Sequence, residues 1–259
     1  MSLLERLGHF FDDIGLIRVG SSYAADIDFL ILLVLVLVGV WFLAAEFVFV
    51  YFIMKFRAKG DGRRADYIDG KNKRHKKWIT YPHLAVLAFD VLIIVVSFNV
   101  WHKIKMDLPE NPDAVIRITG QQWAWIIQHP GADGELDTAD DIRTVDELHV
   151  ENDKLYHFKL EATDVLHSFS VPVWRIKQDA IPGRSITGWF RPTATGTFDL
   201  QCTEICGFGH GVMKGEVFVE SAEEHAAWVA ANTPPAAANA AAAPSAGETP
   251  PAANSHPAG

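Results

Sequence analysis

The sequence has only two cysteines, Cys202 and Cys206, among its 259 residues. A small secreted domain held together by disulfides normally has more cysteines at wider spacings, so that class of protein is not indicated. No C-x-x-C-H segment is present, which excludes a haem attached covalently through this motif. Two cysteines four residues apart instead suggest ligands.

The first residues, MSLLERLGHFFDDIG, lack the features of a cleavable signal peptide. They show no basic n-region, no apolar h-region and no small-residue cleavage site. We expect residues 1–26 to form an N-terminal extracytoplasmic segment that contains a short amphipathic surface helix.

Positive charge is scarce in the second half of the chain. Residues 106–232 contain 21 Asp and Glu against nine Lys and Arg, a net charge of −12. An acidic body of this kind argues against nucleic acid as a partner and favours a cationic protein partner.

Two long apolar runs lie in the first half. Residues 27–54 and 82–101 are each long enough to cross a membrane, and the first is too long and too uniformly apolar for a buried core helix. The loop from Lys55 to Tyr81 carries ten Lys and Arg against three Asp, so it should face the cytoplasm. Residues 27–105 are therefore predicted to form a transmembrane helix hairpin in contact with membrane lipid.

Glu46 and Asp90 are acids within these runs. Acids at membrane depth are costly and usually face protein. They belong either to a proton pathway or, as we favour, to a polar contact with a neighbouring subunit of a larger complex.

Residues 106–232 have the texture of a β-domain. Short runs of β-forming residues alternate with turn signals such as Pro182-Gly183, which predicts a β-sandwich or Greek-key barrel. Residues 221–231 suggest a closing helix, and the Ala/Pro-rich residues 233–259 suggest a disordered tail. The predicted strands are residues 114–119, 123–128, 148–150, 156–161, 167–173, 185–190, 196–201 and 216–220.

The segment QCTEICGFGHGVMKG concentrates soft and borderline donors: Cys202, Cys206, His210 and Met213. This donor set suits copper. Two thiolates on one loop can bridge two metals, and each metal then needs one imidazole and one weak ligand. A second histidine is required from elsewhere, and His167 in DVLHSFSVP is well placed.

Three other interpretations of the loop exist. A Cys202–Cys206 disulfide is conceivable in an oxidising compartment but leaves Glu204, His210 and Met213 unexplained. A Cys2His2 zinc site fits by count, although its usual spacing differs and it has no use for a methionine. The third interpretation is that these Cys and His side chains are structural residues of a small core and are not metal ligands.

The stretch from Asp164 to Met213 resembles subunit II of the haem–copper oxidases, the cytochrome c oxidase family. The matching elements are DVLHSFSVP, KQDAIPGR and CTEICGFGH followed by Met213, with GQQWAW at residues 120–125 upstream. The resemblance implies a two-helix transmembrane hairpin followed by an all-β, cupredoxin-like Greek-key barrel.

The resemblance also implies roles for the loop. Cys202 and Cys206 would bridge two coppers in a CuA centre, with His167 and His210 as terminal ligands. Met213 and the backbone carbonyl of Glu204 would be weak ligands. In this family the carboxylate of that glutamate also reaches a magnesium or manganese ion at the boundary with subunit I.

Three further positions take roles from the resemblance. Trp123 matches the aromatic residue through which cytochrome c delivers its electron, although a core tryptophan is the alternative. Asp164 would belong to an acidic docking face, or else be a solvated loop acid. Asp179 should lie near the boundary with subunit I without being a ligand.

The chain departs from the family in three places. Residues 126–142 replace an aromatic and acidic segment, and their acids form either a small calcium-type oxygen site or a solvated turn. Ala124 stands where an aromatic residue is common in the family, so the family's details of donor docking do not carry over directly to this chain. His75 stands where many members have a glutamate at a proton channel, so proton entry there is not supported. The acids of the turn are Asp133, Asp137, Asp140 and Asp141.

The expected function is that of subunit II of a terminal cytochrome c oxidase in a bacterial inner membrane. The N-terminus and residues 106–232 would lie on the periplasmic side, and the partners would be subunit I, other oxidase subunits and cytochrome c. The chain would pass electrons to haem in subunit I, where oxygen is reduced and protons are pumped; it would carry no haem itself. The alternatives are a copper subunit of a nitric oxide reductase and a quinol-oxidase-type subunit II, whose lineage lacks the copper ligands.

Overall fold

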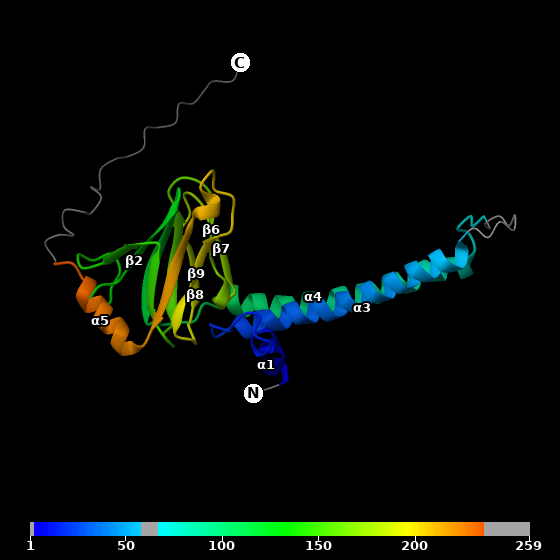
Figure 1. Ribbon diagram of the computed structural model, residues 1–259, viewed down its shortest axis with the longest axis horizontal. Coiled ribbons are helices and arrows are strands. Elements are labelled where there is room, and N and C mark those ends of the chain that lie inside the picture. The colour runs from blue at the N-terminus through cyan, green and yellow to red at the C-terminus, as the bar shows by residue number, and fades with distance from the viewer. Residues whose placement is uncertain (1–2, 58–66, 236–259) are drawn as a thin grey trace, which may run out of the picture.

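The structure is a computed structural model, and it describes residues 3–57 and 67–235. It consists of a long helix pair with a β-domain at one end, and the short helix α1 lies beside the junction (Figure 1). Part of the predicted basic loop and the predicted tail from residue 236 onward lie outside the described residues.

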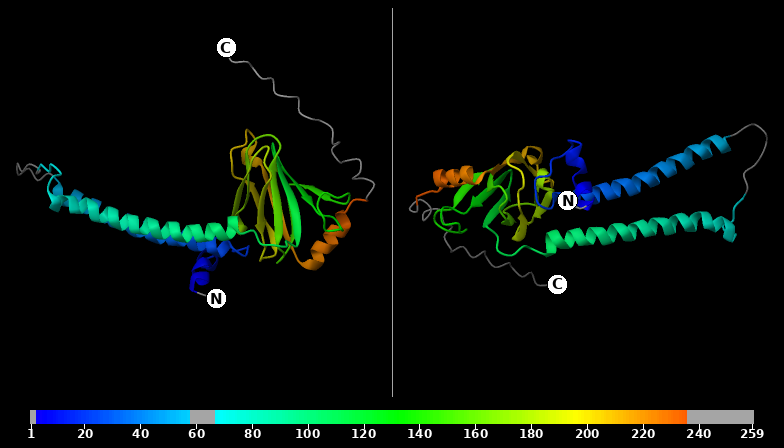
Figure 2. Two further views of the ribbon diagram at one scale, coloured as in Figure 1. Left: turned by 180° about the vertical axis from the view of Figure 1, so that it is seen from behind. Right: turned by 90° about the horizontal axis from the view of Figure 1, so that it is seen from below.

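The helix pair consists of α3 (Ala24–Phe56) and α4 (Lys73–Trp101), which continues into the π-helical turn η1 (His102–Met106). Both are long and apolar enough to cross a membrane. They run in the same general direction and spread apart toward the loop that joins them in the right-hand view of Figure 2, and the Trp41 and Phe89 rings are 6.1 Å apart between them. Most of their apolar side chains are exposed, as expected for a surface that faces lipid or other membrane subunits.

Helix α4 begins before the apolar run that was predicted as its span. The side chain of Asn72 caps the helix by accepting a hydrogen bond from the Arg74 amide at 2.9 Å. Lysine and arginine are good helix formers, so the basic residues after Asn72 join the helix. Glu46 and Asp90 are exposed on their helices, and their contact with a neighbouring subunit stays a prediction.

Two short helices precede the hairpin, α1 (Leu3–Gly8) and α2 (Phe10–Asp13). Helix α1 packs closely on the first turn of α3, because a Cβ atom on Gly8 would lie 2.3 Å from the Ala25 carbonyl oxygen. The expected N-terminal surface helix is therefore present as two pieces, held against the hairpin.

The β-domain contains two five-stranded sheets packed face to face (Figure 1). One has the order β3-β2-β1-β5-β8 and the other β4-β10-β9-β6-β7. The first comprises β3 (Ile142–Val145), β2 (Ala124–His129), β1 (Ala114–Gln121), β5 (Tyr156–Ala162) and β8 (Ile186–Phe190). The second comprises β4 (Glu147–Glu151), β10 (Lys214–Glu220), β9 (Gly196–Cys202), β6 (His167–Val171) and β7 (Ile176–Ala180).

Strands β3 and β7 were not predicted. Both are edge strands. The sequence of β7, IKQDA, has one β-branched residue, whereas β3 is short but its sequence, IRTV, has three. Ladder pairing with β2 and β6 makes them strands. The run predicted from residue 167 to 173 also ends early, because Pro172 begins the 3₁₀ turn η2 (Pro172–Trp174) and cannot donate to a ladder.

Large aromatic side chains fill the space between the sheets. Trp125 meets Phe169 edge-on at 5.7 Å, and Trp174 stacks on Phe190 at 4.3 Å. All four are fully buried. Alternate residues of β1, including Ile116 and Ile118, point into the same core, as the period of two in a strand requires.

A buried ion pair ties the β-domain to the start of α3. The Arg175 guanidinium donates to both carboxylate oxygens of Asp28 at 2.6 Å, and the two side chains are 8% and 1% exposed. Arg175 follows η2 with a positive φ of 58° and also donates to the carbonyls of Arg18 and Pro172. Nearby, the Trp189 indole donates to the Ile104 carbonyl at 2.9 Å.

The helix α5 (Ala222–Asn232) closes the far end of the domain. Its N-terminus has a capping box formed by Ser221 and Glu224, which satisfies backbone donors on both sides. Trp228 stacks on the His149 ring at 4.2 Å and meets His129 at 5.1 Å. The predicted closing helix at residues 221–231 is confirmed, one residue later in the chain.

Candidate metal centre

Three segments bring soft donors together at one end of the β-domain. His167 begins β6, Cys202 ends β9, and the remaining donors lie on the loop that leads through η3 (His210–Val212) into β10. Phe169 and Cys202 are opposite each other in the β6–β9 ladder. This register places the distant His167 beside the cysteine loop.

The donor atoms lie at spacings that suit shared metals. The sulfur of Cys202 is 3.7 Å from that of Cys206 and 3.9 Å from Nδ1 of His167. His167, Cys202 and Cys206 are buried and form the one group of three potential ligands found among the described residues. Ligands bound to one metal at about 2.0–2.3 Å are separated by roughly 3.3–3.8 Å at tetrahedral angles, so the cluster is a possible metal site.

The other candidate donors extend this cluster. The sulfur of Cys206 is 3.7 Å from Nδ1 of His210 and 3.8 Å from the thioether sulfur of Met213. The backbone carbonyl of Glu204 lies 3.3 Å from the Cys202 sulfur. Two thiols therefore share a centre that has an imidazole and a weak donor on each side.

This donor set fits copper better than the alternatives weighed from the sequence. Cys202 and Cys206 are free thiols, and their separation is far beyond a disulfide bond of about 2 Å. A zinc site would leave the buried Met213 sulfur without a purpose. Two thiols, two imidazoles and a thioether in one place are ligands that copper prefers.

Burial raises the pKa of the Cys206 thiol to about 11, and the neighbouring Cys202 adds to this rise. A metal must therefore displace a tightly held proton, because the thiolate is the ligand. Metal binding at this site should release protons.

Asp164 supports one ligand directly. Its carboxylate accepts a hydrogen bond from Nε2 of His167 at 2.9 Å, which leaves Nδ1 facing the sulfurs. Burial opposes ionisation of Asp164, yet the hydrogen bonds from His167 and from the Val165 and Gln122 amides hold its pKa below the usual value. Asp164 was predicted to belong to an acidic docking face or to be a solvated loop acid, and its contact with His167 was not predicted.

Trp123 lies against the cysteine loop. A Cβ atom on Gly209 would be 2.4 Å from Cδ2 of Trp123, so the ring rests on the backbone there. The Gln122 side chain donates to the Cys206 carbonyl at 2.7 Å, and its backbone amide donates to Asp164 at 2.6 Å. Neither Gln122 nor Gly209 was predicted to take part in the site, although the glycines on both sides of Phe208 allow a close approach to the backbone.

Asp179 and His75 take less defined places. Asp179 lies on β7 opposite Ser168, next to the residue that pairs with His167. His75 is exposed in the first turn of α4. The place of Asp179 near the boundary with subunit I stays a prediction. The expectation that protons do not enter at His75 also stays a prediction.

The acids of residues 133–141 accept hydrogen bonds from the protein. Arg117 donates to both oxygens of Asp137 at 2.5 and 3.0 Å, and this contact lowers the pKa of Asp137. The Asp140 carboxylate accepts from the Asp133 amide and the Thr138 hydroxyl, and Asp141 accepts from the Asp137 amide. These contacts fold the segment onto β1 and β2 and supply partners for its carboxylates.

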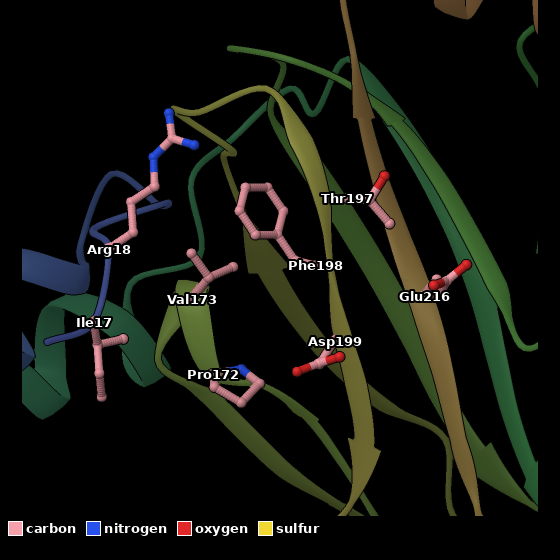
Figure 3. Close-up of a pocket in the computed structure, with 8 residues that line it drawn as sticks. All are labelled: Ile17, Arg18, Pro172, Val173, Thr197, Phe198, Asp199 and Glu216. Atoms are coloured by element: carbon pink, nitrogen blue, oxygen red, sulfur yellow. The ribbon is translucent and has the colours of Figure 1, made fainter. Parts of the chain in front are cut away.

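A separate pocket of about 350 Å³ lies between the segment before α3 and the second sheet (Figure 3). Its wall carries Asp199 and Glu216, which are opposite each other on β9 and β10. The Arg18 guanidinium lies 5.9 Å from the centre of the Phe198 ring beside it. The pocket contains no thiol or imidazole, so it offers nothing comparable to the donor cluster.

Residues 114–221 match the protein family described as cytochrome c oxidase subunit II, periplasmic domain. An alternative cytochrome c oxidase subunit 2 from Bradyrhizobium diazoefficiens is 32% identical over 214 residues, which are 74% of this chain and 74% of the relative. Cytochrome c oxidase subunit 2 of Cereibacter sphaeroides is 27% identical over 239 residues, or 81% of this chain and 77% of the relative.

A solved structure is also similar. The periplasmic domain of subunit II of cytochrome oxidase from Bradyrhizobium japonicum is 29% identical, with a TM-score of 0.43, and the match covers 48% of this chain and 96% of that one.

The fold and the donor cluster define a membrane protein in which two apolar helices carry a cupredoxin-like domain outside the cytoplasm. The chain belongs to the cytochrome c oxidase subunit II family. It is thus a subunit of a haem–copper oxidase complex, an oxidoreductase.

Proposed function

We propose that this chain is the electron-entry subunit of a terminal cytochrome c oxidase. His167, Cys202, Cys206, His210, Met213 and the Glu204 carbonyl would hold a binuclear CuA centre. The observation that carries this proposal is the convergence of these six donors, with neighbouring pairs separated by 3.3–3.9 Å.

Copper held there would supply one-electron redox chemistry. The chain contributes a rigid binding site that is shielded from water. Cys202, Cys206 and Met213 are buried at the end of the sandwich. Asp164 fixes the orientation of His167, and the β6–β9 ladder fixes its distance from the loop. A cradle that holds its ligands in place limits the reorganisation that accompanies each electron transfer.

The remaining roles follow from the same proposal. Reduced cytochrome c would deliver electrons at Trp123, which rests on the cysteine loop. Electrons would pass on to haem in subunit I, where oxygen is reduced to water and protons are pumped. The Glu204 carboxylate would reach a magnesium or manganese ion at the boundary with subunit I. The β-domain and the N-terminus would lie on the periplasmic side of a bacterial inner membrane.

Metal analysis of the full chain in detergent tests the proposal. The apoprotein is loaded with copper, and bound metal and the visible spectrum are measured together. We expect two coppers per chain and a purple colour. One copper per chain, or preferential binding of zinc without a visible band, would contradict the binuclear site.

Variants assign the ligands in the same experiment. Cys202→Ser should abolish the native spectrum, because a bridging thiolate is lost. Met213→Leu should retain copper but change its reduction potential, because only a weak ligand is lost. Met106→Leu is the matched control, since Met106 is an exposed methionine at the end of η1. An equal change of reduction potential in both methionine variants would show that Met213 is not a copper ligand.

A further inference from the structure

The segment that precedes α3 carries apolar side chains on its outer surface. In α1, α2 and the residue after them, apolar residues recur at positions 7, 10, 11 and 14, the spacing that places side chains on one face of a helix. Several of them are exposed, and two more exposed apolar residues follow. We call this exposed set the N-terminal apolar surface; it consists of Leu7, Phe10, Ile14, Leu16 and Ile17.

The exposure of this surface matches that of the membrane span. Leu16 is 64% exposed, compared with 60% for Val40 in the middle of α3. An amphipathic helix normally buries its apolar face against a core. Here the face that packs on the protein is the one that carries Gly8, which lies against Ala25. The N-terminal apolar surface is therefore turned towards a partner outside the chain.

The position of α1 along α3 indicates what this partner is. Gly8 packs on Ala25, and the first exposed large apolar side chain of α3 is Ile31. Six helical residues separate Ala25 from Ile31, a rise of about 9 Å. The headgroup layer on each side of the hydrocarbon core is roughly 5–8 Å thick. Helix α1 therefore lies at about the height of the headgroups of the non-cytoplasmic leaflet.

The direction of α1 agrees with this height. The helix lies across the direction of the helix pair, at the end of the pair that joins the β-domain, in Figure 1 and in the left view of Figure 2. Because a membrane-spanning pair runs through the bilayer, a helix that lies across it is roughly parallel to the membrane surface. An amphipathic helix in this position buries its apolar face about 5–10 Å into the boundary between headgroups and acyl chains.

We propose that the N-terminal apolar surface is an interfacial lipid anchor, whose side chains insert among the acyl chains of the non-cytoplasmic leaflet. Residues 3–17 contain three acids and one arginine, a net charge of −2. Attraction to anionic headgroups therefore does not drive this contact, and apolar burial does. The inference goes beyond the proposed function, since none of the metal-ligand candidates takes part in it.

The chemistry of the surface favours lipid over a second membrane subunit. Helix contacts between membrane subunits are enriched in small residues, which let two backbones approach closely. The N-terminal apolar surface consists only of the large side chains of leucine, isoleucine and phenylalanine. It also lies on the same chain as the exposed apolar band that begins at Ile31, so one bilayer covers both.

The anchor is linked to the β-domain by hydrogen bonds. The Arg175 guanidinium donates to the carbonyls of Ile17 at 3.4 Å and Arg18 at 3.1 Å. The Gly20 amide then donates to the Val173 carbonyl at 3.0 Å. An anchor held in this way fixes the height and tilt of the β-domain above the membrane, in addition to the hairpin.

Photo-crosslinking tests the contact in the oxidase complex that contains the full chain, placed in phosphatidylcholine nanodiscs. The photoreactive residue p-benzoylphenylalanine is introduced at Phe10 or at Ile14, and mass spectrometry identifies what is bound after illumination. We expect lipid adducts at both positions. The same residue introduced at Ile31 should also give lipid adducts, whereas at the exposed Val145 of β3 it should give none.

Hydrogen exchange in the same nanodiscs measures the strength of the anchor. The amides of Ile14 and Leu16 donate to the carbonyls of Phe10 and Phe11, so their exchange reports opening of this segment. Phe10→Ser/Ile14→Ser should speed their exchange at least about tenfold, because two large apolar side chains lose their burial. Asp13→Ser, which changes an exposed polar side chain of the same segment, should change it less than about twofold.

Three outcomes would overturn the inference. Adducts between Phe10 or Ile14 and another oxidase subunit would assign the surface to a subunit contact. Lipid adducts at Ile31 without any at Phe10 and Ile14 would place the surface in water. Equal exchange rates in wild type and the double serine variant would show that the side chains anchor nothing. Copper content does not enter these readouts, so the proposed metal centre stands or fails separately.

Discussion

At the scale of single residues, Asp164 determines how His167 presents itself to the donor cluster. The carboxylate engages Nε2, so the lone pair for a metal must be on Nδ1, which lies 3.9 Å from the Cys202 sulfur. A carboxylate behind a histidine ligand fixes its tautomer and raises its basicity. Gly120 allows this placement, since a Cβ atom there would lie 3.0 Å from the His167 ring.

Asp164→Asn should weaken metal binding, because the amide replaces a charge-assisted hydrogen bond with a weaker one. We expect a loss of affinity of about 10- to 100-fold, measured by competition with a copper chelator. Asp199→Asn is the matched control, since it removes one negative charge from an exposed position of β9. Equal losses in both variants would attribute the effect to net charge and remove the positioning role of Asp164.

At the scale of elements, the pair Asp28–Arg175 joins helix α3 to the β-domain. Both groups are buried, and each guanidinium contact is 2.6 Å long. A buried ion pair adds less stability than its geometry suggests, because both charges lose their hydration. Breaking it is costly, however, because one charge remains buried alone.

Asp28→Asn or Arg175→Met alone should therefore destabilise the chain by about 3–5 kcal/mol. The double variant Asp28→Leu/Arg175→Met should cost clearly less than the sum of the single effects, because neither charge is then left unpaired. Thermal unfolding in detergent, followed by circular dichroism, measures these differences. Additive single and double effects would show that the pair does not couple the two elements.

The stability of the folded chain depends on pH through His129, which lies against Trp228 of α5. Burial lowers the pKa of His129 to about 3, and the neighbouring His149 contributes to this shift. In the unfolded chain the same histidine binds a proton near pH 6.5. As the pH falls from about 6.5 towards 3, the unfolded state therefore binds more protons than the folded state, and stability is lost by up to about 1.4 kcal/mol per pH unit.

His129→Gln should remove this contribution and flatten the acid side of the stability profile. Thermal unfolding midpoints between pH 7 and pH 4 measure it. Parallel profiles for wild type and His129→Gln would show that this residue does not carry the acid sensitivity.

At the scale of the whole molecule, charge is divided between the two ends. Residues 106–232 have a net charge of −12, whereas residues 55–81 have +7. The acidic field extends over the domain that carries the donor cluster. Fields of this size raise the rate at which a cationic partner arrives by ~10–10³-fold at low salt.

Electron entry from a cationic cytochrome c should therefore slow by about tenfold or more as salt is raised, because counter-ions screen the field. Stopped-flow rates over a range of ionic strengths measure this slope. A c-type cytochrome with a net negative charge is the control, and its rate should not fall. A flat salt profile with the cationic donor would remove the acidic domain from donor steering.

Local pattern alone determined much of this protein. The two apolar runs predicted the hairpin, because a membrane span depends on length and composition. The spacing from Cys202 to Met213 predicted the donor loop, because ligands on a single short loop stay close whatever the rest of the fold does. Eight of the strands also followed from β-forming residues between turns.

Only the tertiary structure decided the contacts between distant segments. The edge strand β7 exists through ladder pairing, because its sequence IKQDA carries little β preference, whereas the four residues of β3 favour a strand but are too short a run to define one alone. Three contacts show this: the hydrogen bond between Asp164 and His167, the packing of Trp123 on the backbone of Gly209, and the ion pair between Asp28 and Arg175. In each contact, either the two residues come together only on folding or the directions of their side chains depend on the fold. These pairings depend on strand register and burial, which no short stretch of sequence specifies, and they determine how the donor loop is held, covered and approached.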